Sequence, residues 1–347
     1  MPSAKAVPRL VPPRLWMASI PSLGRKLNQF HQSRADHHIK KWSPIAGNQF
    51  PADFNISAHV RPFLALADHP LSFWGIDRCL RIWERIDTHH SHVFHLGLFA
   101  QSIDLQRKFK TPWEDSRFHD FQRQILDQFV SLLEFLSIDR KRLEVSYCGG
   151  CVVGGHPDGR DRLLKNKYRF PEDRTSRQFL RQRGIRCVGV PALANISIAD
   201  REGTPAGLSL EVFCDDVEIG TILFHFFKIR KGMLRPINYL ASYGVGLERL
   251  VSVIQGEDFL QSVQRYALAR KILERKVKVA RSSMFDRDVI RLLYGLEALA
   301  LIPNQLSMPQ RRLVQRLKLD VKRVILDLGV AFEDVKELFS FFQHWKD

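Results

Sequence analysis

Ala241-Ser-Tyr-Gly-Val-Gly-Leu-Glu-Arg-Leu-Val-Ser-Val-Ile-Gln-Gly256 is the stretch that decides the fold. Its two glycines, separated by one residue, let the backbone turn and bring a flat ligand close to the main chain. The apolar run after them predicts a helix, with Arg249 on its first turn. A guanidinium there can face a triphosphate or an adenine ring, because it is permanently charged and planar and can stack. On its own, the pattern also fits an ordinary strand-to-helix turn.

Two upstream segments make the pattern more specific. They read Gly203-Thr-Pro-Ala-Gly-Leu-Ser-Leu-Glu-Val-Phe-Cys-Asp-Asp216 and Val217-Glu-Ile-Gly-Thr-Ile-Leu-Phe224. Both resemble segments of the alanyl-tRNA synthetases. The G-x-G-x-x-R of residues 244–249 resembles motif 3 of the class II aminoacyl-tRNA synthetases, in its alanyl form. Three segments in the family's order and spacing are much more specific than one.

A further segment is His69-Pro-Leu-Ser-Phe-Trp-Gly-Ile-Asp-Arg-Cys-Leu-Arg-Ile-Trp-Glu-Arg-Ile-Asp87, followed by a His-rich stretch to Gly97. Alternation around residues 73–82 predicts two antiparallel strands joined by a charged loop. A strand, loop and strand with an arginine near the end of the first strand resembles motif 2 of the same class, and Arg81 is the candidate arginine. This segment is also similar to O-phosphoseryl-tRNA synthetase, so the nearest family is ambiguous.

The resemblance implies an α+β fold, in which a class II synthetase-like antiparallel sheet is flanked by helices and followed by a C-terminal helical domain. It implies ATP and Mg²⁺ as cofactors. In that chemistry an amino-acid carboxylate attacks the α-phosphate of ATP, so arginines and Mg²⁺ must stabilise the developing charge. Arg81 would hold the α-phosphate and Arg249 the adenine face and γ-phosphate, and these two are the expected catalytic residues. Glu211 and Glu218 would carry Mg²⁺.

The remaining site residues are also implied by the resemblance. The expected ATP-binding set is Arg81, Glu84, Asp87, His92, Phe94, Gly244, Gly246 and Arg249. The expected amino-acid-binding set is Glu211, Thr221 and Ser242. Ser242 departs from the alanyl pattern, which has an aspartate there to hold the substrate's ammonium group, and Thr221 replaces an asparagine. A hydroxyl supplies no opposite charge, so the identity of the amino acid is left open.

Charge and the C-terminal third point to a polyanionic partner. The 347 residues carry a formal net charge of +16, an excess that favours binding to phosphates. Residues past Gly256 read as basic helices and resemble the acceptor-stem-binding domain of alanyl-tRNA synthetase. The expected tRNA-binding residues are Arg275, Lys276, Arg311, Arg312, Arg316 and Arg323. The expected partners are therefore a tRNA acceptor stem and an amino acid, with a homodimer left open.

These segments divide the chain into three expected parts, namely a basic disordered arm at 1–23, a catalytic domain at 24–256 and a helical domain at 257–347. A helix is expected over 104–140, where Phe121, Ile125, Phe129, Leu132 and Leu136 form one apolar stripe. No apolar run approaches the roughly 18 residues of a membrane span. We therefore expect a cytoplasmic protein that makes no membrane contact.

Cysteines and histidines offer weaker signals. Five cysteines, an odd number, favour a reducing compartment. Cys148-Gly-Gly-Cys151 fits half a zinc site, a redox pair or simply two thiols on a Gly-rich turn. His89, His90, His92 and His95 invite a metal interpretation, but contact with ATP or RNA is favoured because no carboxylate or cysteine set accompanies them.

Three functions remain open at this stage. The first is a compact ligase that makes an aminoacyl adenylate and transfers it to a tRNA 3′ end, without an editing domain. The second makes the adenylate but passes the aminoacyl group to a carrier protein or a small amine. The third is an RNA-binding relative that has lost ATP binding.

Overall fold

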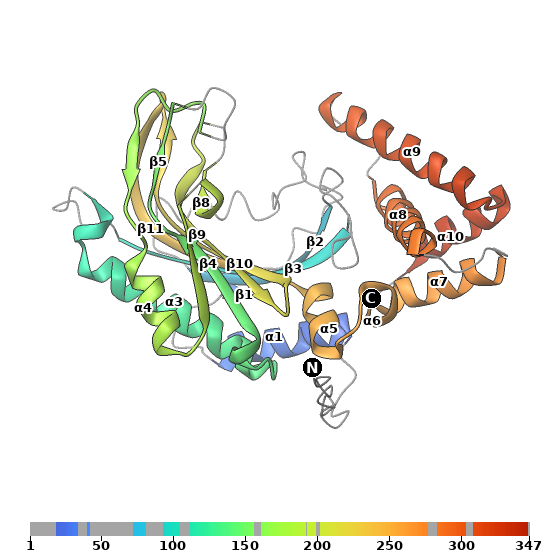
Figure 1. Cartoon of the computed structure of the whole chain (residues 1–347), viewed down its shortest axis with the longest axis horizontal. Helices are drawn as coiled ribbons and strands as arrows, with labels where there is room; N and C mark the ends of the chain where they lie inside the picture. Colours follow the sequence, from blue (N-terminus) through green and yellow to red (C-terminus); the bar gives the residue numbers. More distant parts are fainter. Residues whose placement is uncertain are drawn as a thin grey trace, which may run out of the picture.

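The computed structural model of the protein describes residues 19–33, 40–41, 72–80, 93–104, 111–155, 161–191, 193–198, 202–276, 283–302 and 308–345. Its fold is α+β, with a mostly antiparallel sheet, helices packed against it and a helical C-terminal part beside it (Figure 1). The predicted architecture is thereby confirmed. Within the described ranges, every helix is too short or too polar to cross a membrane.

Among the described residues, the central sheet has nine strands in the order β1-β2-β3-β11-β10-β9-β4-β7, with β8 paired to β9. Their bounds are β1 Lys40–Lys41, β2 Ser72–Leu80, β3 Val93–Ile103, β4 Leu143–Cys148, β7 Arg186–Val190, β8 Ile196–Ser197, β9 Pro205–Cys214, β10 Val217–Arg230 and β11 Met233–Gly246. The pairs from β2 to β4 are antiparallel, and the pairs β1/β2 and β4/β7 are parallel. A separate hairpin consists of β5 Cys151–Val153 and β6 Tyr168–Phe170.

Helices lie in two groups. In Figure 1, α1 Ile20–Ser33, α3 Ser116–Phe135 and α4 Arg174–Gln182 lie along one face of the sheet. The second group follows the sheet: α5 Leu247–Gln255, α6 Phe259–Ser262, α7 Gln264–Lys276, α8 Ser283–Ala300, α9 Met308–Leu328 and α10 Phe332–His344. Short 3-10 turns cover Pro112–Glu114, Arg140–Arg142 and Leu193–Asn195. The described part of the chain after Gly256 is thus helical, as the sequence predicts.

The core between the sheet and α3 is aromatic. The ring of Tyr243 stacks on Phe99 at 5.0 Å and meets Phe129 edge-on at 5.2 Å, while its hydroxyl accepts a 3.1 Å hydrogen bond from Gln128 Nε2. Such pairs add to the free energy gained by burying the rings. The five residues of the predicted apolar stripe are all buried, with exposed fractions of 3% or less.

Two boundaries differ from the sequence-based prediction. The helix α3 is shorter than the expected 104–140, because a 3-10 turn at Pro112–Glu114 precedes it and Ser137, with φ of 64°, stops it in the left-handed region. At the N-terminus, α1 begins at Ile20, inside the arm expected to be disordered. Leu23 and Leu27 are completely buried there, so this segment belongs to the folded body.

Candidate active site

The strand β11 passes straight into α5, and Gly246 is both the last residue of the strand and the N-cap of the helix. The glycines here permit close contacts. A Cβ on Gly220, beside β11, would lie 2.5 Å from the carbonyl oxygen of Gly244, and one on Gly244 would lie 3.0 Å from Leu96. A Cβ on Gly246 would press on the Arg249 side chain at 3.3 Å. The two glycines of the G-x-G pattern therefore leave space for the Leu96 side chain next to residue 244 and for the Arg249 side chain next to residue 246.

Arg249 lies against Glu218, near the start of β10. Its Nη1 donates a 3.0 Å hydrogen bond to the Glu218 carbonyl oxygen and lies 3.2 Å from the Glu218 carboxylate. The arginine side chain is 13% exposed and the glutamate side chain 30% exposed. Two residues that the resemblance assigns to ATP and to Mg²⁺ are thus brought together as an ion pair.

Glu211 and Thr221 are direct cross-strand neighbours on β9 and β10. The Thr221 hydroxyl donates a 2.8 Å hydrogen bond to Glu211 Oε2. Because Thr221 is also paired with Gly244, its side chain lies on the same face of the sheet as the glycines. Glu218 pairs with Phe213, two residues beyond Glu211 on β9, and so the carboxylates of Glu211 and Glu218 share that face.

Ser242 lies on the same face, opposite Leu223 on β10 and Ala100 on β3. Its exposed fraction is 0%, and its hydroxyl has no hydrogen-bond partner among the described residues. A buried hydroxyl without a partner is costly, and such groups are uncommon in folded proteins. Ser242 therefore has an unused donor and acceptor at the position that the resemblance assigns to the amino acid.

The face fits the chemistry of a nucleotide in its donor set. Mg²⁺ in phosphate-transfer sites is typically held by one or two carboxylates plus the phosphates themselves, and Glu211 and Glu218 supply two. Within the described ranges there is no cluster of three or more His, Cys, Asp or Glu residues that could hold a metal by itself.

The segment that resembles motif 2 lies only partly within the described residues. The strands β2 and β3 pair from Ser72 with Gln101 to Leu80 with Val93, so the predicted antiparallel strand pair is confirmed. Arg81, Glu84, Asp87 and His92 lie outside the described residues, and Phe94 lies in β3 with its side chain outside them. The predicted meeting of Arg81 and Arg249 stays a prediction.

A buried ionic cluster joins this site to the C-terminal helices, and the sequence did not reveal it. Glu248 accepts the His95 backbone N–H at 2.9 Å, and its Oε1 lies 2.9 Å from His95 Nδ1. Arg265 on α7 donates to Glu248 at 2.8 Å and to Glu297 on α8 at 2.7 Å. The Tyr266 hydroxyl also bonds to Glu297. Arg265 lies in the region that the sequence predicts to consist of basic helices, yet it is only 1% exposed.

The cluster keeps Glu248 ionised. Burial by itself raises the pKa of the Glu248 carboxyl. The charges and hydrogen bonds of His95 and Arg265 lower the pKa by more than burial raises it, and the result is a pKa of about 2. The burial of Arg265 could have been predicted from its spacing in the sequence. Arg265 precedes the buried residues Ala269 and Leu273 by four and eight positions and so lies on the same face of the helix. His95, for which contact with ATP or RNA is expected, is paired with Glu248 in the structure, and its contact with a ligand stays a prediction.

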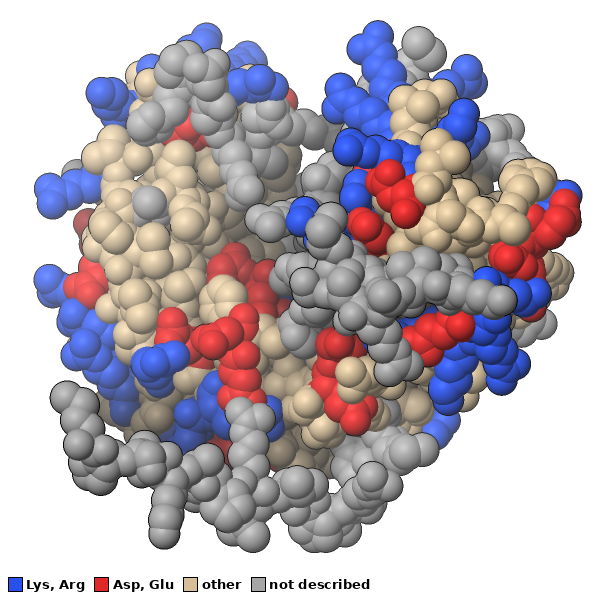
Figure 2. All heavy atoms as spheres, turned by 45° about the vertical axis from the view of Figure 1, so that its right-hand side comes forward, with Lys and Arg blue, Asp and Glu red and all other residues tan. Residues whose placement is uncertain are grey.

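The expected RNA-binding residues lie on the helices beside the sheet. Arg311, Arg312 and Arg316 are exposed on α9, and Arg275 is exposed at the end of α7. Figure 2 shows Lys and Arg side chains gathered at the top of the right-hand lobe, where Figure 1 places α9. The other two expected residues have acidic partners: Arg323 lies 3.8 Å from Asp327, and Lys276 bridges Asp334 and Glu337 on α10 at 3.2 and 3.4 Å.

The buried face of α9 fixes the direction of this basic surface. Val314, Leu317, Val321 and Val324 are buried. A Cβ on Gly295 of α8 would lie 2.4 Å from Val321 Cγ2, so the glycine permits the close approach of the two helices. The arginines consequently point away from α8.

No known family profile matches the chain, and no curated protein sequence does. Among solved structures, the chain is similar to two pyrrolysyl-tRNA synthetase structures from Desulfitobacterium hafniense. One is 12% identical with a TM-score of 0.38, and the alignment covers 71% of this chain and 72% of that chain. The other is also 12% identical with a TM-score of 0.39, covering 72% and 74%. At this identity the likeness assigns neither a substrate nor an activity.

Proposed function

We propose that the protein is a class II synthetase-like ligase that activates an amino acid with ATP and transfers it to the 3′ end of a tRNA. The observation that carries this proposal is the convergence of the motif segments. Residues that are far apart in the chain form five neighbouring strands, β2-β3-β11-β10-β9, and the described candidate side chains lie on one face of them.

In this proposal each side chain has a task. Arg249 exchanges its contact with Glu218 for the nucleotide, so its positive charge meets the phosphates. Glu211, oriented by the Thr221 hydroxyl, and Glu218, once released by Arg249, accept Mg²⁺, which neutralises charge as pyrophosphate departs. Ser242 offers its hydroxyl to the amino acid. The exposed arginines of α9 contact acceptor-stem phosphates.

The test is ATP–pyrophosphate exchange, screened over the twenty amino acids and phosphoserine. We expect exchange with one substrate or a few related ones. Arg249→Ala is expected to reduce it roughly a hundredfold or more, the usual effect of removing a group that stabilises developing charge. Arg270→Ala is the control, because Arg270 is also a partly buried arginine paired with a glutamate, but its partner Glu274 lies on the same helix, α7. Absence of exchange with all substrates would remove the proposal.

A second candidate is an RNA-binding protein that no longer binds ATP. Two observations favour it, namely the closed position of Ser242 and the engagement of Arg249 with Glu218. Calorimetry with ATP and Mg²⁺ separates the candidates. Binding heat that disappears in Arg249→Ala supports the ligase, whereas RNA binding without any ATP binding supports the second candidate.

A further inference from the structure

The hairpin of β10 and β11 extends past the strands that flank it. Among the described residues, pairing with β9 ends where Pro205 meets Lys228, and pairing with β3 ends where Ile103 meets Tyr239. The two strands of the hairpin stay paired with each other as far as Arg230 and Met233. The turn between them thus lies at the end of the sheet, near β5 in Figure 1.

Contacts on both sides hold this turn in one geometry. Lys231 and Gly232 have φ of 51° and 75°, as a two-residue type I′ turn requires. The Glu202 carboxylate accepts their backbone N–H groups at 2.9 and 3.1 Å. The Lys165 backbone N–H donates a 2.9 Å hydrogen bond to the Gly232 carbonyl oxygen, and a Cβ on Gly232 would lie 2.7 Å from Lys165 Cγ. The loop at 161–167 is therefore packed against the turn.

The turn and the loop together present a set of cations, which we call the tip surface. It consists of the exposed side chains of Lys165, Lys167, Arg230, Lys231 and Arg235. None of the five forms an ion pair with a described residue. The acidic side chains of the same segments do not offset this charge fully, because Asp161 is completely buried and Glu202 binds the backbone of the turn.

The register of the hairpin fixes where its arginines project. Arg235 is the direct cross-strand neighbour of Lys228, and Arg230 follows Lys228 by two residues. These three side chains therefore lie on one face of the hairpin. The other face carries Ile229 and Leu234, which are buried. Arginines held in this way suit phosphates, because a guanidinium can bind a phosphate through two hydrogen bonds.

Arginines on the helices of the same part of the molecule are paired instead. Arg123 on α3 lies 2.6 Å from Asp120, and Arg177 on α4 lies 2.7 Å from Glu172. The tip surface thus keeps positive charge that the helices neutralise. Binding of such cations to a polyanion releases condensed counterions, and this release favours association.

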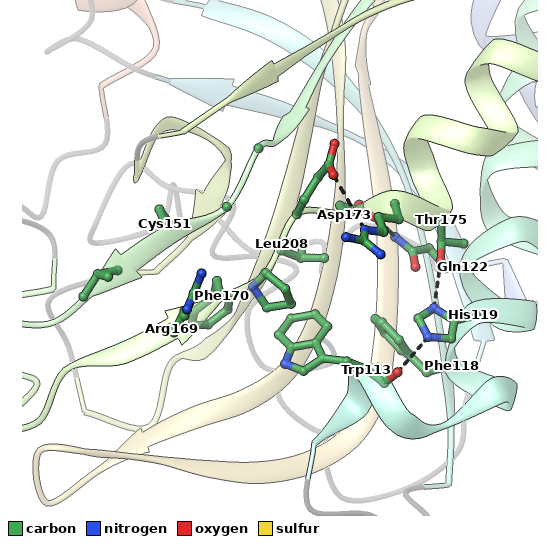
Figure 3. A pocket seen from close by; sticks show the side chains of 16 residues that line it. Trp113, Phe118, His119, Gln122, Cys151, Arg169, Phe170, Asp173, Thr175 and Leu208 are labelled. Carbon is green, nitrogen blue, oxygen red and sulfur yellow. Dashed lines mark hydrogen bonds and ion pairs between the residues drawn. The ribbon is translucent and has the colours of Figure 1, made fainter.

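The tip surface is distinct from the cavity beside it. A cavity of about 920 Å³ is lined by the start of α3, the β5–β6 hairpin and the start of α4 (Figure 3). Its lining residues include none of the five cations. Inside it, Gln122 Nε2 donates to Asp173 at 2.8 Å, and His119 Nδ1 lies 2.8 Å from the Thr175 hydroxyl oxygen. Cations spread over an outer surface fit an extended polyanion better than a single small anion.

We propose that the tip surface binds the phosphate backbone of an RNA, separately from the arginines of α9. Figure 2 shows Lys and Arg side chains at the top of the left-hand lobe as well as over α9. The choice of RNA over DNA rests on the proposed function. A membrane is disfavoured, because no large exposed apolar side chain lies in the described segments 161–167 and 228–236, and surfaces that lie on membranes bury such side chains.

The test measures binding of the full-length protein to an RNA duplex over a salt series by fluorescence anisotropy. The double variant Arg230→Gln, Arg235→Gln is expected to reduce the slope of log binding constant against log salt by roughly 0.7–0.9 for each arginine. Lys165→Gln with Lys167→Gln examines the loop in the same way and is expected to reduce the slope as well. A duplex of scrambled sequence should give the same slopes, since phosphate contacts carry no base information.

The matched control is the double variant Arg140→Gln, Lys141→Gln. It removes two exposed charges just before β4, whose Leu143 pairs with Cys214 at the opposite end of β9 from the hairpin turn. This control is expected to keep the wild-type slope. Urea midpoints equal to that of the wild type verify that each variant is folded.

An unchanged slope in either variant of the tip surface, or an equal decrease in the control, would overturn the proposal. Wild-type protein that binds phosphatidylserine vesicles but no RNA would also overturn it, in favour of a membrane. Equal affinity for a DNA duplex of the same sequence would overturn the assignment to RNA. The ATP–pyrophosphate exchange assay contains no RNA, so failure of exchange and failure of this proposal are separate results.

Discussion

At the scale of the single residue, replacing Ser242 is expected to have one effect on stability and a different effect on amino-acid binding. Its buried hydroxyl has no partner among the described residues, so Ser242→Ala removes an unsatisfied group and is expected to raise the free energy of unfolding by about 1 kcal/mol. Under the proposed function, the same change raises the KM for the amino acid. Urea denaturation and the exchange assay measure the two effects.

Ser252→Ala is the control for Ser242. The Ser252 hydroxyl is buried but donates a 2.5 Å hydrogen bond to the Glu257 carbonyl oxygen, so its removal is expected to cost about 1 kcal/mol. If both variants are destabilised equally, the Ser242 hydroxyl has a hydrogen-bond partner in solution, and the proposal that this hydroxyl is available to the amino acid is wrong.

His225 gives a pH dependence at the same scale. Burial lowers its pKa to about 3, and its Nε2 lies 2.7 Å from the Ser197 hydroxyl oxygen. The unfolded chain takes up a proton below pH of about 6.5 while the folded chain does not, so stability is full above that pH and falls as the pH drops toward 3. We expect His225 to account for about 2 kcal/mol of loss between pH 7 and pH 5.

Urea midpoints across that range measure the effect. The variant His225→Asn, which cannot be protonated, is expected to flatten this part of the profile. A profile as steep as that of the wild type would show that other groups control the acid limb.

At the scale of the element, the cluster of Glu248, Arg265 and Glu297 joins α5, α7 and α8. Arg265→Met leaves two buried carboxylates without their cation and is expected to cost about 3–5 kcal/mol. Arg270→Met, on the same helix but in a partly exposed pair, is expected to cost less than about 1 kcal/mol. Denaturation of both variants in urea decides, and equal destabilisation would contradict the buried role of Arg265.

The elements also show what the sequence could predict. Periodicity identified the strand around 73–82 and the stripe of α3, because apolar residues there alternate or recur at helical spacing. The short helix α4 was not found, since it is highly charged and only Phe179 and Leu180 supply buried apolar side chains of any size. The G-x-G-x-x-R pattern placed Gly244, Gly246 and Arg249 at the strand-to-helix junction. No local pattern could pair Arg249 with Glu218 or Arg265 with Glu297, because those contacts depend on the tertiary fold.

At the scale of the whole molecule, part of the excess positive charge lies on α9, where Arg311, Arg312 and Arg316 are exposed. Replacing Arg311, Arg312 and Arg316 by Gln is expected to reduce the slope of log binding constant against log salt by roughly 0.7–0.9 for each phosphate that the variant no longer neutralises. Filter binding of a tRNA acceptor-stem duplex over a salt series measures the slope. Lys276→Gln is the control, because its ammonium is engaged by Asp334 and Glu337, so this variant should weaken the bridge between α7 and α10 and keep the slope.

The direct passage of β11 into α5 has a mechanical consequence. No residue separates Gly246 from Leu247, and the next residue, Glu248, is clamped by Arg265 of the C-terminal helices. A displacement of α7 relative to the sheet would therefore act on α5 and, through α5, on Gly244 and Gly246, because no loop lies between the helix and the strand. The C-terminal helices and the candidate active site are thus joined by a buried ion pair and a direct strand-to-helix connection.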